Sequence, residues 1–115
     1  MITYLNLTPH PLNVKSVDGE YVTIPPSPDG AARVIYDRLP PEQVSIAGHE
    51  IAVSVSGSPR EIIGLPEPEE GVVLIVAKAV VDASPRHRGD LMSPGRLIYD
   101  EDGTVIGCDG LTRRA

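Results

Sequence analysis

The chain has 115 residues, a formal net charge of −6, a single cysteine and neither Phe nor Trp. This length suits a single domain over residues 1–115 with one modest core, built here from Val, Ile, Leu and Ala. The acidic balance argues against binding along an extended nucleic acid, and one cysteine cannot form an internal disulfide.

Twelve Pro and eleven Gly residues divide the chain into short segments rich in Val, Ile and Thr, which is the pattern of a mostly β domain. A first strand is predicted over residues 1–7, and the two Pro residues of 8–11 bend the chain after it. Residues 12–24 predict a hairpin, because Asp18-Gly19 supplies the positive φ that a type I′ turn requires.

After a loop, residues 32–37 predict a further strand, and the Pro residues of 38–42 predict a break in it. Residues 43–57 alternate between apolar and polar side chains and predict a second hairpin that turns at Ala47-Gly48-His49. The following residues, 60–65, are expected to be extended, and the acidic, Pro-rich residues 66–71 to form an exposed loop.

The uninterrupted apolar run that begins at Val72 predicts the most buried strand, with Leu74, Ile75 and Val76 at its centre. A brief helix is expected from about residue 77 to 83, before Pro85 ends it. The last hairpin is predicted over 96–111. We therefore expect a small barrel or sandwich of short antiparallel strands with one short helix.

No apolar run reaches the roughly 18 residues of a membrane span, because Lys78 interrupts the longest one. The N-terminal residues also lack the basic and apolar regions of a signal peptide. The sequence therefore predicts a cytoplasmic protein with no membrane contact. No metal-binding motif is present, and neither a metal nor a cofactor is expected.

Five short landmarks follow one another along the chain, namely NLTPH (6–10), GLPEP (64–68), IVAKAVVDASP (75–85), RHRGDLMSPG (86–95) and VIGCDGL (105–111). In this order they resemble a family of small uncharacterised proteins of bacterial and phage genomes. The resemblance spans nearly the whole chain and implies a compact domain without specifying a reaction. The chain departs from the family pattern at Ala77, where Ser is usual, so no role is assigned to a hydroxyl there.

Basic side chains gather in the segment from Arg86 to Arg96, although the chain as a whole is acidic. Arginine binds phosphate or carboxylate through two parallel hydrogen bonds, and the neighbouring Gly residues let a ligand approach the backbone. An alternative interpretation is that these arginines pair locally, for example Arg88 with Asp90, or only keep a loop solvated. The candidate ligand-binding residues are His10, Arg86, Arg88, Asp90 and Arg96.

These features favour a non-catalytic module that binds a small anionic molecule such as a nucleotide. The phage-type resemblance implies a sharper form, a protein that sequesters a nucleotide signal of host defence. A second hypothesis is a structural or protein-interaction module that forms homo-oligomers through exposed strand edges or Pro-rich loops. A third is an enzyme that cleaves phosphodiesters with His10, His49 and His87. Cys108 is expected to be a buried, inert thiol.

Overall fold

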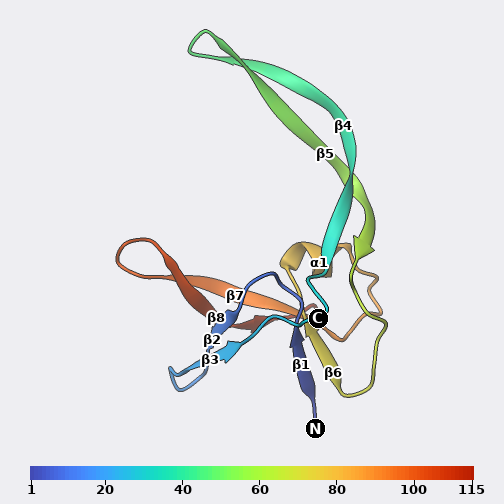
Figure 1. Cartoon of the computed structure of the whole chain (residues 1–115), viewed down its shortest axis with the longest axis vertical. Helices are drawn as coiled ribbons and strands as arrows, with labels where there is room; N and C mark the ends of the chain where they lie inside the picture. The colour runs from blue at the N-terminus through green and yellow to red at the C-terminus, as the bar shows by residue number, and fades with distance from the viewer.

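The computed structural model describes all residues from 1 to 115 and is mostly β, with eight strands and one short helix, as the sequence predicts. In chain order the elements are β1 (Thr3–Asn6), β2 (Leu12–Lys15), β3 (Tyr21–Ile24), β4 (Arg33–Ile46), β5 (His49–Ile63), β6 (Val72–Ile75), α1 (Lys78–Ala83), β7 (Leu91–Tyr99) and β8 (Val105–Thr112). Six strands form a body, from which β4 and β5 project as a long arm (Figure 1).

The body is a nearly closed, barrel-like sheet with the strand order β1-β6-β7-β8-β2-β3. Its two end strands approach each other, because Asn6 at the end of β1 bridges to Pro26, just after β3. The Ser27 N–H donates to the Asn6 carbonyl at 2.7 Å, and the Asn6 amide donates to the Ile24 carbonyl at 3.0 Å. Of the predicted barrel or sandwich, the barrel is therefore confirmed. The prediction that its strands are antiparallel is wrong for three pairs, because β1–β6, β6–β7 and β2–β8 pair in parallel.

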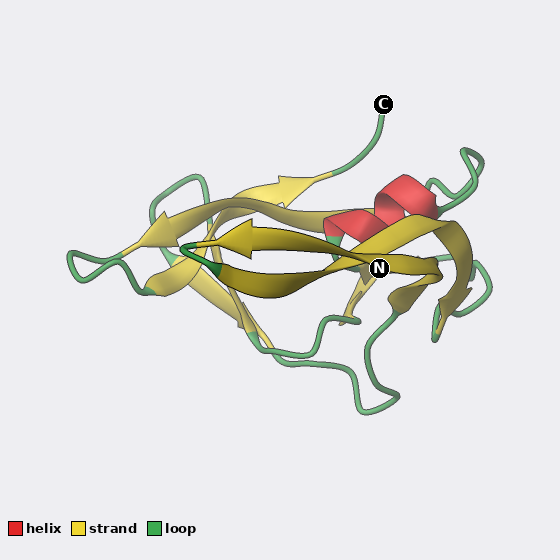
Figure 2. Cartoon of the chain, turned by 90° about the horizontal axis from the view of Figure 1, so that it is seen from above, coloured by secondary structure: helices red, strands yellow, loops and turns green.

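The core lies where β6 leads into α1. Leu74, Ile75 and Val76 are 2%, 0% and 0% exposed, so the predicted buried run is confirmed, with Val76 directly following the strand. The predicted helix is also confirmed, and its Val80 and Val81 are buried. Helix α1 lies at the base of the arm (Figure 1) and contacts β7. Figure 2, seen from above, shows this short helix in red among the strands. The helix has six residues and is neither long nor apolar enough to cross a membrane.

The arm turns at Ala47 and Gly48, with φ values of 53° and 80°, as the second predicted hairpin requires. The predicted break at 38–42 is wrong, because β4 continues through it. A register shift between Leu39 and Glu42 places the two intervening Pro residues outside the regular ladder. Their missing N–H groups therefore cost no ladder hydrogen bond, and the strand bends without ending.

The remaining two hairpins form where the sequence predicts them, and β7 pairs antiparallel with β8. Gly19 has φ 90° between β2 and β3, but the predicted type I′ turn is wrong, because Asp18 does not have the positive φ that this turn requires at both central residues. The segment predicted as an Arg-rich loop is corrected in its second half, because Gly95 and Arg96 lie within β7. A Cβ on Gly95 would lie 2.3 Å from the Asp109 carbonyl oxygen. This glycine serves the close approach of β8, which explains its presence without a ligand.

Candidate functional site: a cavity lined by four arginines

Four arginines line one cavity of about 200 Å³ between the segment that follows α1 and the residues that follow β8. Arg86 and Arg88 come from the first segment, and Arg113 and Arg114 from the second. Their convergence is notable in a chain with net charge −6, because like charges gather at an energetic cost that a bound anion relieves. The complete lining is Arg86, Arg88, Gly89, Leu91, Arg113, Arg114 and Ala115.

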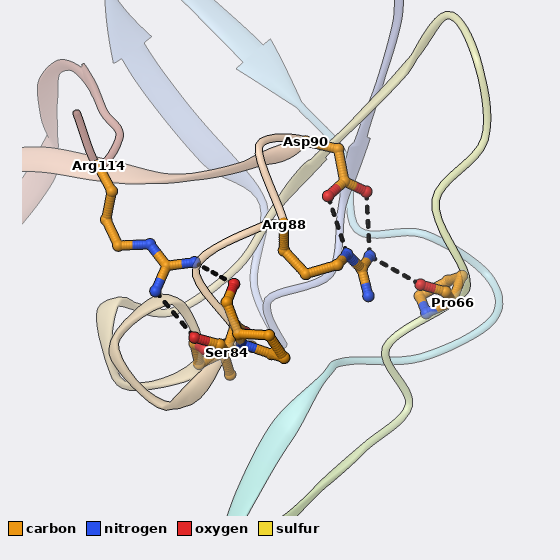
Figure 3. Close-up of polar contacts among 7 residues, drawn as sticks. Pro66, Ser84, Arg88, Asp90 and Arg114 are labelled. Atoms are coloured by element: carbon orange, nitrogen blue, oxygen red, sulfur yellow. Dashed lines mark hydrogen bonds and ion pairs between the residues drawn. The ribbon is translucent and has the colours of Figure 1, made fainter.

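Arg88 is held firmly at the wall of this cavity. Its Nε and Nη2 donate to the two carboxylate oxygens of Asp90, both at 3.0 Å, and Nη2 also donates to the Pro66 carbonyl at 2.9 Å (Figure 3). The two side chains are only 10% and 15% exposed. The hydrogen bond from Arg88 holds the pKa of Asp90 below its usual range, and the same bond raises the pKa of Arg88. Local pairing therefore does occur for Arg88, and it leaves Nη1 without a hydrogen bond.

Arg114 is positioned by neutral partners. Its Nη1 donates to the Ser84 carbonyl at 2.9 Å, and its Nη2 donates to the Pro85 carbonyl at 2.8 Å (Figure 3). These carbonyls follow the end of α1, where the chain leaves the helix. No carboxylate forms an ion pair with Arg114. These two hydrogen bonds also hold the residues that follow β8 against the residues that follow α1, and the cavity lies between the two segments.

Arg86 and Arg113 are exposed and form neither an ion pair nor a side-chain hydrogen bond within the chain. Their guanidinium groups are therefore free to rotate toward a ligand. Among the four arginines, Asp90 compensates only Arg88 through a direct ion pair. The cavity is thus lined by two arginines that hydrogen bonds hold in place and by two whose side chains have no partner within the chain.

Of the five predicted ligand-binding residues, only Arg86 and Arg88 line this cavity, and Asp90 contributes only as the ion-pair partner of Arg88. The side chain of Arg96 is 87% exposed and lies 3.9 Å from the Asp109 carboxylate, an exposed pair of small energetic value. His10 lines a separate, more apolar hollow of about 360 Å³ beside β8. The structure therefore brings together Arg86 and Arg88, with Asp90 behind Arg88, and leaves His10 and Arg96 elsewhere.

The remaining residues with catalytic potential are also dispersed. His49 lies at the tip of the arm, and His87 is exposed without lining the arginine cavity. Cys108 is 3% exposed, and burial raises the pKa of its thiol, which therefore stays protonated and weakly nucleophilic near neutral pH. Side chains of His, Cys, Asp and Glu form no group of three that could hold a metal ion.

No family model, curated protein or solved structure matches the chain.

Proposed function

We propose that the chain is a non-catalytic binding module that holds a small anionic ligand in the cavity lined by Arg86, Arg88, Arg113 and Arg114. The observation that carries the proposal is that four arginines line one cavity of about 200 Å³ in a chain of net charge −6. Each guanidinium offers a planar fork of donors that matches a phosphate or carboxylate. A binding role is favoured over catalysis because no histidine lines the cavity.

The size of the cavity indicates which part of a ligand it would hold. Pockets for whole drug-sized ligands are typically about 300–1,000 Å³, so a cavity of about 200 Å³ suits a single phosphoryl or pyrophosphoryl group. Arg88 and Arg114 are already fixed by hydrogen bonds, so little side-chain entropy is lost when they bind. In this proposal a nucleotide places its phosphate in the cavity and its base outside. Sequestration of a nucleotide signal, which the phage-type resemblance implies, is the sharper form of the proposal.

Removing the two free arginines tests the site without disturbing its anchored residues. The double substitution Arg86→Ala and Arg113→Ala should weaken anion binding by more than 100-fold, since each charge-assisted hydrogen bond contributes about 1.5–3 kcal/mol. The free energy of unfolding should change little, because both side chains are exposed. The measurement is calorimetric titration with pyrophosphate, mononucleotides and cyclic dinucleotides.

The matched control is Lys15→Ala with Arg96→Ala, which removes the same charge from exposed positions outside the cavity. This control should bind within a few-fold of the parent. Equal losses in both double variants would mean that overall charge, and not the cavity, attracts the anion. Absence of binding by the parent to every member of the panel would contradict the proposal.

A further inference from the structure

The outer part of the arm has one apolar face and one polar face. Val44 lies directly opposite Ile51, Glu42 opposite Val53, and Ile46 opposite His49. Residues opposite one another share a face, and so do alternate residues along a strand, so these rungs all present their side chains to the same side. The four apolar members, which we call the apolar face of the arm, are Val44, Ile46, Ile51 and Val53.

The other face of the same rungs is polar or small, since it carries the pairs Gln43–Ala52 and Ser45–Glu50. The apolar face continues toward the body, because Val55 alternates with Val53 along β5 and pairs with Leu39. Leu39 and Val55 line a hollow of about 650 Å³ at the bend of the arm. An apolar strip therefore runs from the tip of the arm to its bend.

This strip has no cover within the chain. Val44, Ile46, Ile51 and Val53 are 41%, 59%, 42% and 37% exposed, and Leu39 is 45% exposed. Figure 1 shows the arm projecting away from the body, and the radius of gyration is 17.4 Å, against about 13 Å for a compact domain of this length. A lone two-stranded ribbon is only marginally stable in water, so a one-sided ribbon of this length requires a partner surface.

The charges of the arm indicate which partner fits. Residues 33–63 hold three arginines and four carboxylates, which contribute only −1 to the net charge of −6. Two copies of this acidic chain therefore repel each other least through their arms. Two identical apolar strips also match each other in length and width, as a two-fold symmetric interface requires. A partner that carries a strong charge of one sign would find no matching charge on the nearly neutral arm.

We propose that the apolar face of the arm is a homodimer interface, packed against the same face of the arm of a second copy. The two ribbons then form a small four-stranded sandwich with a layer spacing of about 10 Å. A stable interface buries about 800 Å² on each partner. The apolar face contributes to this area together with the hollow at the bend, into which the partner's arm can extend. This inference is independent of the proposed anion site.

The test compares two double variants on neighbouring rungs of the arm. Val44→Glu with Ile51→Lys places an opposite-charge pair on the apolar face, and Gln43→Glu with Ala52→Lys places the same pair on the polar face. The new side chains can pair across the strands in either case, and the net charge stays at −6. Sedimentation velocity over a wide range of protein concentrations measures the mass of the parent and of each variant.

The parent and the polar-face variant should sediment as dimers of the 12.3 kDa chain, and the apolar-face variant as a monomer. A milder variant, Val44→Ala with Ile51→Ala, removes apolar area without adding charge, so that the effect on the dimer can be separated from unfolding of the hairpin. It should raise the dimer dissociation constant at least tenfold. A parent that is monomeric at all concentrations would overturn the proposal. So would a dimer that both apolar-face variants leave unchanged, because that dimer would use another surface.

Discussion

Replacing Val76 with Asp should lower the free energy of unfolding by about 4 kcal/mol or more, enough to unfold much of a marginally stable domain. Val76 is 0% exposed and packs in the cluster that includes Leu7, Val80 and Leu91. A carboxylate there would be buried without a partner, and the core offers no cation to pair with it. Urea denaturation followed by circular dichroism measures the change.

The neighbouring residue provides a control of the same chemistry. Ala77 is exposed and is the N-cap of α1, which has no side-chain cap and no acidic residue in its first turn. Ala77→Asp should therefore leave the protein as stable as the parent or stabilise it by about 0.5–1 kcal/mol. If Val76→Asp unfolds at nearly the same urea concentration as Ala77→Asp, the assignment of the core is wrong.

The substitution Asp90→Asn should cost about 2 kcal/mol at neutral pH. It leaves the Arg88 guanidinium, which is mostly buried, with the Pro66 carbonyl and a weaker, uncharged partner. The control is Asp82→Asn, because the Lys78–Asp82 ion pair is 2.9 Å long but well exposed and should contribute less than about 0.5 kcal/mol. Equal effects of the two substitutions would contradict the structural role of the Arg88–Asp90 pair.

The stability contributed by Asp90 also depends on pH in a defined direction. The hydrogen bond from Arg88 lowers the pKa of Asp90 in the folded protein relative to the unfolded value of about 3.9. The pair therefore contributes fully above about pH 4, and its contribution is lost as the pH falls through the folded pKa. The difference between parent and Asp90→Asn should be constant near neutrality and shrink in acid. Urea midpoints measured at neutral pH and near pH 3 decide this, and a difference that persists unchanged would contradict it.

Local signals were sufficient for the hairpins and the core. The turns of the first two hairpins each carry a glycine with positive φ, Gly19 and Gly48, and the apolar run around Ile75 proved to be the most buried. The parallel pairings of β1 with β6 and of β2 with β8 depend on contacts distant in sequence, which turn signals do not report. The length of the arm was missed because Pro40-Pro41 usually ends a strand, whereas here a register shift accommodates both.

The site was predictable only in part. Charge clustering located Arg86 and Arg88, but it gave no reason to place Arg113 and Arg114 beside them. That proximity depends on the β7–β8 register, in which Ser93 pairs with Thr112 and the following residues return toward Leu91. The position of the turn at 100–103 indicates this register, because the turn of a hairpin determines which residues of its two strands pair. Gly95 misled the prediction of a ligand-binding loop, because its small size allows the close pairing of β7 with β8.

The most direct test of the proposed anion site is a nuclear magnetic resonance titration of the ¹⁵N-labelled chain with pyrophosphate. The amide resonances of residues 84–91, apart from Pro85, and of residues 112–115 should shift together and saturate with one dissociation constant, because both segments line the same cavity. Amides around His10 and Arg96 should shift little, since these residues lie elsewhere. Shifts that centre on His10 or Arg96, or no saturable shift at residues 84–91 and 112–115, would contradict the account.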